Sequence, residues 1–238
     1  MDDLFIHRRG DSEDSYMKTN IIVNLFTSSD QLVVLKDGIL QSVASRRLPQ
    51  AKRNWKVPKF AEIDGVWIST TGEDALHNNI LGKNDTFMTN IQEFTIPVEV
   101  TRDDYVGFYG ARIIREGDIF NLRNPCPMPI FDMSIGKNYV NGFINRPENG
   151  FYIEEHNTPH FHQPKSPTSA GHIVLAKYLA GKLYMTRFVI PFGCGMYIPP
   201  YVLHSDAELV GDYFVMYTKA AEYRTGILKT ETANCVAS

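Results

Sequence analysis

The chain has 238 residues, enough for one domain with a sizeable core or for two small domains. Hydrophobic residues make up 43% of it and charged residues 21%, a balance typical of folded globular proteins and not of disordered ones. The net charge is −3, and Lys and Arg are spread along the chain. This argues against a nucleic-acid-binding protein, because such proteins concentrate positive charge on one surface.

The opening stretch and the cysteines indicate a cytoplasmic protein without a membrane partner. The stretch MDDLFIHRRGDSEDSY is charged and has no apolar run, so it does not resemble a signal peptide. The longest apolar segments, such as 21–26 and 32–35, are too short to cross a bilayer. The chain has three cysteines, which are widely spaced and form no CxxC pair, and this favours free thiols in a reducing compartment.

Short β-rich segments separated by Gly, Pro, Asn and Asp occupy most of the chain. The first is a predicted hairpin, in which Asp37-Gly38 forms the turn between strands at 31–35 and 39–43. Helix formers make 41–48 and 219–229 the two weak helix candidates. Further strands are predicted at 66–70, 87–96, 107–114, 172–179, 183–190, 195–198 and 212–218. Many short strands with regularly spaced turns indicate an all-β sandwich or barrel.

Three of the seven histidines lie in the window HNTPHFHQP at 156–164. His160 and His162 are two residues apart, so on a strand they point to the same face and can chelate one metal ion. A second stretch, PFGCGMYIPPYVLHSD at 191–206, predicts a turn at Gly193, a rigid turn at Pro199-Pro200, and His204 at the start of the next strand. The two stretches together are the strongest functional signal in the sequence.

These two stretches resemble the two motifs of the cupin superfamily, which are small jelly-roll barrels. Gly193, Pro199 and His204 match the spacing of the second motif, although Tyr201 stands where that motif has another glycine. His160-Phe161-His162 matches the core of the first motif. The glutamate that usually follows is missing after Gln163. The resemblance covers roughly 105–218.

The resemblance implies an all-β, cupin-type jelly-roll barrel with additional N-terminal strands. In this interpretation residues 1–20 are a mobile N-terminus and 21–104 a β-rich extension packed on the barrel. Residues 105–218 form the barrel that carries the metal site, and 219–238 form a C-terminal tail. The Pro-rich stretch at 124–129 is then a rigid loop within one domain, although it can also mark a domain boundary.

The resemblance also implies that His160, His162 and His204 bind a divalent metal ion, with Fe, Zn, Mn and Ni all open. His172 is the candidate that replaces the missing glutamate, or it is an ordinary strand residue. The alternative for the whole set is a polar cleft in a cupin that has lost its metal. Imidazole suits all of these metals, so the residues alone do not identify one.

Four further residues are candidates for catalysis. His156 and Glu155 are a possible outer shell or general base beside the metal, or else part of a solvated loop. The preceding Glu154 is interpreted with Glu155 as surface charge. Tyr178 shares the strand parity of His172 and is expected to point inward, and Arg187 can bind a carboxylate or a phosphate if it points inward too.

The leading hypothesis is a metal-dependent cupin enzyme that acts on a small polar molecule by isomerase, lyase or dioxygenase chemistry. The alternative is a non-catalytic cupin that binds a small ligand as a sensor or storage module, and a third possibility is a β-sandwich interaction domain. The expected partners are a small-molecule substrate and, as the resemblance implies, a second copy of the chain in a homodimer.

Overall fold

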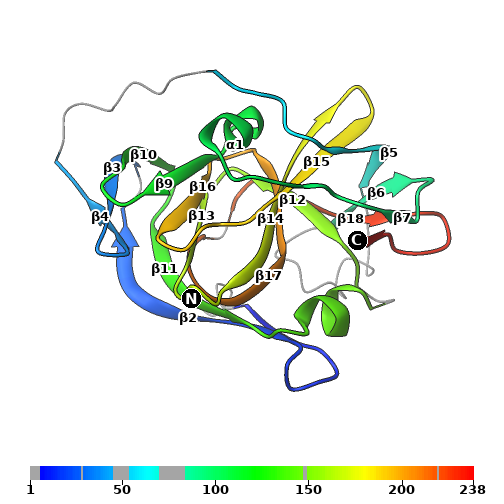
Figure 1. Ribbon diagram of the computed structural model, residues 1–238, viewed down its shortest axis with the longest axis horizontal. Helices are drawn as coiled ribbons and strands as arrows, with labels where there is room; N and C mark the ends of the chain where they lie inside the picture. The colour runs from blue at the N-terminus through cyan, green and yellow to red at the C-terminus, as the bar shows by residue number, and fades with distance from the viewer. Residues whose placement is uncertain (1–5, 28, 45–53, 70–83, 147–148, 219) are drawn as a thin grey trace.

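The computed structural model describes residues 6–27, 29–44, 54–69, 84–146, 149–218 and 220–238 (Figure 1). The fold is all-β, as predicted. Its one α-helix in these ranges is α1 (Asp103–Tyr109), and a short π-helix spans Val140–Ile144. None of the helices described is long and apolar enough to cross a membrane. The strands, in chain order, are β1 (His7–Arg9), β2 (Tyr16–Phe26), β3 (Ser29–Lys36), β4 (Ile39–Ser42), β5 (Ala61–Ser69), β6 (Asn84–Thr89), β7 (Glu93–Phe94), β8 (Val98–Glu99), β9 (Arg112–Arg115), β10 (Ile119–Asn124), β11 (Met128–Ile135), β12 (Tyr152–His156), β13 (His160–Pro164), β14 (Ala170–Leu179), β15 (Lys182–Phe188), β16 (Cys194–Ile198), β17 (Leu203–Met216), β18 (Tyr223–Lys229) and β19 (Val236–Ala237).

Strand β17 joins the two main sheets because its two halves pair with different partners. Its first half pairs with β14 and, at Glu154–His204, with β12. Its second half pairs with β11 and β13, and this sheet continues through β2 to β1 on one side and through β16 to β9 on the other. A single 14-residue strand therefore places residues of both sheets around the same interior.

The first half of β17 also belongs to a closed ring of strands. From β17 the pairings run through β14, β15, β5, β6, β18 and β12, and the last of these returns to β17. Each of these strands contributes to one buried apolar cluster, the ring core, which includes Ile63, Phe87, Val174, Leu183 and Leu228. The ring combines strands from 61–69, 84–89 and 223–229 with strands of 152–210, so it does not follow the predicted boundaries at 104/105 and 218/219.

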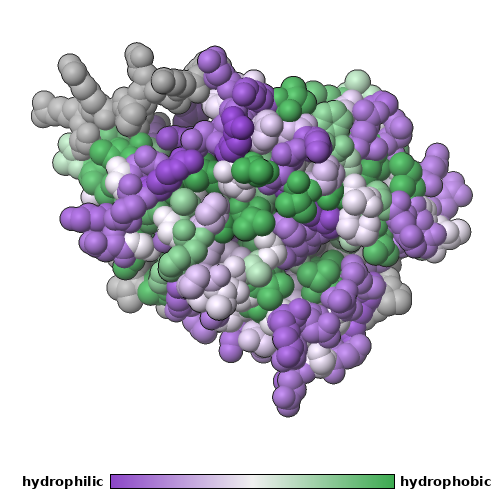
Figure 2. Space-filling view, in the orientation of Figure 1, coloured by the Kyte–Doolittle hydropathy of each residue, from purple (hydrophilic) through white to green (hydrophobic). Residues whose placement is uncertain are grey.

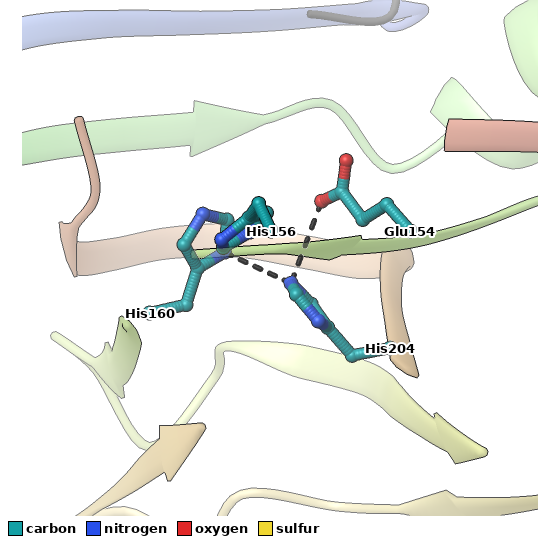
Figure 3. Close-up of side chains that lie close together, drawn as sticks. All are labelled: Glu154, His156, His160 and His204. Atoms are coloured by element: carbon teal, nitrogen blue, oxygen red, sulfur yellow. Dashed lines mark hydrogen bonds and ion pairs between the residues drawn. The ribbon is translucent and has the colours of Figure 1, made fainter. Parts of the chain in front are cut away.

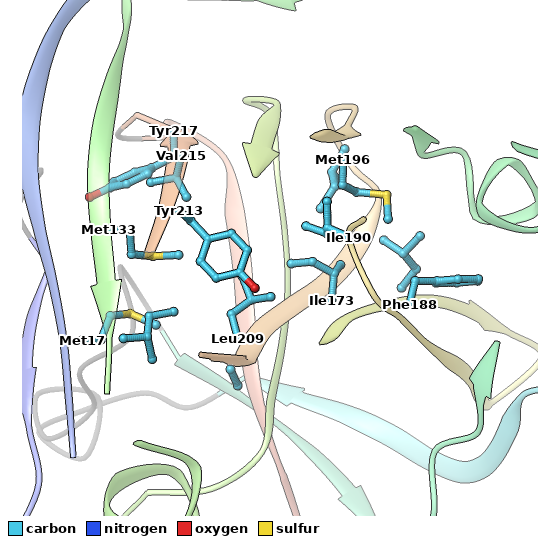
Figure 4. Close-up of a cluster of buried hydrophobic side chains, with 14 of the residues drawn as sticks. Met17, Met133, Ile173, Phe188, Ile190, Met196, Leu209, Tyr213, Val215 and Tyr217 are labelled. Atoms are coloured by element: carbon cyan, nitrogen blue, oxygen red, sulfur yellow. The ribbon is translucent and has the colours of Figure 1, made fainter. Parts of the chain in front are cut away.

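A second apolar core fills the space between the ring and the other sheet (Figure 4). Met133 and Met196 come from β11 and β16 of the sheet opposite the ring, which we call the far sheet. Ile173 and Leu209 come from β14 and β17. A third core lies on the outer side of the far sheet, where the small sheet β10-β3-β4 covers it. On the face in Figure 2, groups of hydrophobic residues lie among hydrophilic ones.

A β-bulge on β17 changes which of its residues face the second core. The register with β14 shifts between His172–Glu208 and Val174–Ser205. His204 and Asp206 point to the interior before the shift, and Ala207 and Leu209 point there after it. The bulge therefore places two polar side chains and then two apolar ones against the same interior, which a regular strand does not do.

Two local predictions have clear outcomes in the structure. The Asp37-Gly38 hairpin is confirmed: Lys36 pairs with Ile39, and both turn residues have positive φ angles of 53° and 73°. The helix predicted at 219–229 is wrong, because β18 forms there between β12 and β6. Tertiary pairing overrides local propensity, and the ring of Trp67 lies where a Cβ on Gly226 would be.

Two other predictions concern the N-terminal part. The sequence predicts a mobile segment at 1–20, of which residues 1–5 lie outside the described residues. Within 6–20, β1 and the start of β2 are paired strands of the sheet, and Met17 is fully buried. A backbone that is hydrogen-bonded and packed on both sides is not a free terminus. Of the helix candidate at 41–48, residues 41–42 belong to β4, and residues 45–48 lie outside the described residues.

Candidate metal centre

Four side chains from three strands meet at the edge of the second core (Figure 3). Glu154 and His156 come from β12, His160 from the start of β13, and His204 from β17. One ligand atom from each, three imidazole nitrogens and one carboxylate oxygen, lies within 4.8 Å of all the others. The group is held by local pairing, because Glu154 lies directly opposite His204 and β13 follows β12 after a short turn.

Backbone carbonyls orient two of the imidazoles. The Nδ1 atom of His156 lies 2.6 Å from the carbonyl oxygen of Thr158, and Nδ1 of His204 lies 2.8 Å from that of Val202. A carbonyl only accepts, so each Nδ1 carries the hydrogen and each Nε2 keeps its lone pair. Such a hydrogen bond behind the ring is the usual support of a metal-binding histidine.

The inward-facing nitrogens are poorly satisfied by protein groups. Nε2 of His156 is buried and has no hydrogen-bond partner among the described residues. Nε2 of His204 lies 3.1 Å from Nδ1 of His160 and 3.5 Å from a carboxylate oxygen of Glu154 (Figure 3). Buried polar atoms are normally paired, so the unpaired nitrogen indicates a missing partner at this point.

Burial keeps the three imidazoles neutral. It lowers the pKa of His156 to about 3, with a further contribution from the neighbouring His204, and it lowers the pKa of His204 to about 4. The pKa of His160 is also well below its ordinary value, because of burial and the surrounding histidines. Neutral imidazoles are the form that binds metal, so near neutral pH no proton has to leave these rings first.

Glu154 shows the opposite shift for the same reason. Burial, and then the negative charge of Asp206, raises the pKa of the Glu154 carboxyl to about 8. A cation at the centre of the group favours the ionised carboxylate and opposes that shift. The donor set is therefore electrostatically suited to a positive ion.

A small cavity adjoins the group. Its volume is about 20 Å³, which is room for about one water molecule. Glu154 and His160 line it, and so does His162, whose two ring nitrogens are buried without a partner in the described part of the chain. The cavity therefore continues from the four-residue group toward the interior of the second core.

The structure brings together only some of the histidines predicted as ligands. His160 and His204 are in the group, and His162 is one pleat further along β13, with ring centroids 5.5 Å from those of His160. His172 is not brought to the group, because it lies on the same side of β14 as Val174, which faces the ring core, and its Nδ1 is 3.8 Å from Glu208. The carboxylate of the group comes instead from Glu154, which precedes the HxH motif in the chain, whereas the missing glutamate would follow it.

The predicted catalytic residues are also distributed differently. His156 is part of the group itself rather than a loop or outer-shell residue. Glu155 points to the other side of β12, where it pairs with Arg224 at 3.4 Å. Tyr178 donates to the carbonyl of Gly65 at 3.1 Å, away from the group.

Arg187 is buried and points inward, but toward the ring core and not toward the histidines. Its Nε and Nη2 donate to the carboxylate of Glu208 at 2.7 and 2.5 Å, and its Nη1 donates to two carbonyl oxygens. A guanidinium held in this way has its donors occupied by the protein.

Glu154 is the residue that the sequence interpretation missed. Glu154-x-His156 has the same two-residue spacing as His160-x-His162, so both its side chains share one face of a strand. That spacing was a usable signal. The pairing of β12 with β17, which brings Glu154 opposite His204, has no counterpart in the local sequence.

No protein-family model matches the chain, and no curated protein and no solved structure matches it. The resemblance to the cupins therefore depends on the motif residues, and the description of the site depends on its geometry. What the geometry supports directly is a buried Glu and three histidines that can hold a metal ion.

Proposed function

We propose that the chain is a cupin-type, metal-dependent enzyme whose divalent metal ion is bound by Glu154, His156, His160 and His204. One observation carries the proposal: three neutral imidazoles and one carboxylate converge within 4.8 Å, from strands separated by up to fifty residues. Burying four such polar groups together without a partner is unfavourable, so a bound cation explains why the fold assembles them.

The donor set favours a first-row transition metal over calcium or magnesium. Imidazole nitrogens suit Zn, Fe, Mn and Ni, whereas Ca²⁺ and Mg²⁺ prefer all-oxygen sites. Bound at this position, such an ion supplies Lewis-acid chemistry to a small polar substrate, as isomerases, lyases and dioxygenases use it.

The protein's own groups set the conditions around the ion. The Thr158 and Val202 carbonyls fix the ring orientation of His156 and His204. The adjoining cavity has room for about one water molecule, because its volume is only about 20 Å³. A substrate therefore has to be small, at least in the part that reaches the ion.

The decisive experiment is the metal content of the purified chain and of single variants after reconstitution, measured by inductively coupled plasma mass spectrometry. His156→Ala and His204→Ala are expected to lose the metal. His172→Ala is the matched control, because it removes the same kind of side chain outside the group, and it is expected to keep the metal.

The outcome separates the proposal from its alternatives. Full metal occupancy in both His156→Ala and His204→Ala contradicts the site. No metal in the wild-type chain under any reconstitution condition supports the non-catalytic, small-ligand-binding cupin instead. Retention of metal by His162→Ala distinguishes the proposed set from one that includes both histidines of the HxH motif.

A further inference from the structure

A buried arginine lies in the cavity beside the candidate metal centre. Arg8, on strand β1, is 5% exposed, and it lines the cavity with Ile6 from the same segment. The lining residues that matter here come from the sheets around the second core: Tyr152, Glu154, His160, His162 and Asp206. The N-terminal strand thus contributes a positive charge to a space that already contains two of the candidate ligands.

The guanidinium of Arg8 is only partly used by the protein. Its Nη1 donates to the hydroxyl of Tyr139 at 3.0 Å and contacts the sulfur of Met17 at 3.8 Å. Its Nε is buried with no partner, and no carboxylate oxygen of the described residues forms an ion pair with it within 4.0 Å. Buried arginines are almost always paired, so this one has donor capacity left for a ligand.

The second acid that lines the cavity, Asp206, is engaged elsewhere. The hydroxyl of Tyr152 donates to its carboxylate. The pair Arg187–Glu208 shows what a closed bidentate contact looks like in the same protein, and Arg8 has no such contact.

The charges around the cavity do not cancel once a divalent ion is bound. The ion and Arg8 bring three positive charges, and the carboxylates of Glu154 and Asp206 bring two negative ones. The histidine ligands add no charge, because a histidine binds metal through a neutral imidazole. One positive charge is therefore left in a buried space, and one anionic group would neutralise it.

We propose that this cavity takes the carboxylate group of a short-chain carboxylic acid, which Arg8 binds on the side away from the metal position. This inference rests on the proposed function, because it places the acid between Arg8 and the bound ion. A carboxylate is planar and singly charged, so it matches the guanidinium fork and the residual charge. Among anionic groups that offer two oxygens to the fork, a carboxylate is the smallest, so its head needs the least adjustment of a cavity of about 20 Å³, whereas a phosphate or an aromatic ring needs more.

The test uses the full-length chain, stripped with a chelator and loaded with Co(II), whose visible absorption reports changes at the ion. Sodium formate and sodium acetate are titrated in, with benzoate and inorganic phosphate as larger or differently shaped anions. Formate and acetate are expected to change the Co(II) spectrum saturably, and benzoate and phosphate are not. Equal responses to all four anions would overturn the carboxylate assignment.

Two neighbouring arginines give a matched pair of variants. Arg8→Met is expected to weaken acetate binding roughly 10- to 100-fold, the usual worth of a hydrogen bond to a charged group. Arg9→Met removes an exposed arginine from the same strand and is expected to leave acetate binding unchanged. Co(II) uptake is expected to be the same in both, because neither residue is in the ligand group.

Each failure points to one proposal. Without Co(II) uptake by the wild-type chain, the metal site itself fails. With Co(II) uptake but no spectral response to formate or acetate, or with equal acetate affinity in wild type and Arg8→Met, the carboxylate site fails and the metal site stands. If circular dichroism shows that Arg8→Met does not fold, Arg8→Lys takes its place, since it keeps the charge but loses the fork. Unchanged acetate affinity in that variant also overturns the inference.

Discussion

Two buried polar clusters lie on opposite faces of the β14–β17 pair, and they differ in how completely their atoms are bonded. On the ring side, Arg187 and Glu208 form two short contacts with each other, and Arg187 also donates to the carbonyls of Ile96 and Ser238. On the other side, the group of Glu154 and three histidines leaves a buried imidazole nitrogen without a partner in the part of the chain that the structure describes.

We call the Arg187–Glu208 cluster the closed cluster and the group of Glu154 and three histidines the open cluster. The difference between them separates a structural cluster from a candidate site. In the Arg187–Glu208 cluster each charge has its counter-charge inside the protein, so nothing further is needed to bury it. In the histidine group Nε2 of His156 has no partner among the described residues, and Nε2 of His204 has only His160 and Glu154 beside it, so an added cation would satisfy nitrogens that the protein leaves open. The two clusters are therefore expected to respond differently to mutation and to chelation.

The largest effect is expected in the closed cluster. Arg187→Met leaves the Glu208 carboxylate buried without its partner, which typically costs about 3–5 kcal/mol in the free energy of unfolding. Urea denaturation of the variant measures this loss. Metal content is expected to stay at the wild-type level, since Arg187 faces the ring core.

A loss of metal in Arg187→Met would break the comparison, because it would show that the two clusters are coupled across β17. A loss of stability below about 1 kcal/mol would show instead that the ion pair is replaceable, as some buried pairs are.

The next effect is expected from chelation, which should act on the open cluster alone. A metal held at a free concentration of 100 times its dissociation constant stabilises the fold by about 2.7 kcal/mol. Chelator is therefore expected to lower the free energy of unfolding of the wild-type protein by about that amount. His204→Ala is expected to show no response to chelator, and a full response would contradict the ligand assignment.

Some features of the fold and of the open cluster could be predicted from the sequence. Strand content, the Asp37-Gly38 turn and the shared face of His160 and His162 follow from local spacing, and all of these depend on residues close together in the chain. The position of His204 near His160 agrees with the spacing of the second cupin motif.

What the sequence did not show depends on pairings between distant strands. Glu154 was interpreted as surface charge because nothing nearby indicates that β12 lies against β17. His172 was counted on the face of the histidines, and parity along a single strand does not tell which face of β14 looks toward them. The bulge at Asp206–Ala207 also changes which residues of β17 share a face, and the residue types at that position do not predict it.

A smaller effect is expected from the charge of Glu154 in the metal-free protein. Its pKa is about 8 in the fold against an ordinary value of 4.5, so between these values the folded protein holds a proton that the unfolded chain has lost. The free energy of unfolding therefore falls as pH rises through this window, by up to about 1.4 kcal/mol per pH unit from this group.

Glu154→Gln removes the carboxyl group that takes up this proton on folding. In the presence of chelator, the stability of the variant minus that of the wild type is expected to grow by up to about 1.4 kcal/mol between pH 6 and pH 7. Urea denaturation at the two pH values measures it. A difference that does not change with pH would mean that Glu154 is ionised in the metal-free fold, and the electrostatic account of the open cluster would then be wrong.

The smallest effect is expected at His172, and it sharpens the boundary between the clusters. Its side chain is 30% exposed, its Nδ1 is 3.8 Å from Glu208, and burial lowers its pKa, so near neutral pH it is an uncharged neighbour of an acid that Arg187 already satisfies. His172→Ala is expected to cost less than about 1 kcal/mol in the free energy of unfolding and no metal. Loss of metal in this variant would indicate that β14 contributes to the site and that His172 is a metal ligand. Retention of metal, together with its loss in His156→Ala, would establish that the acid and the extra histidine of this site come from the strand before the HxH motif and not from the one after it.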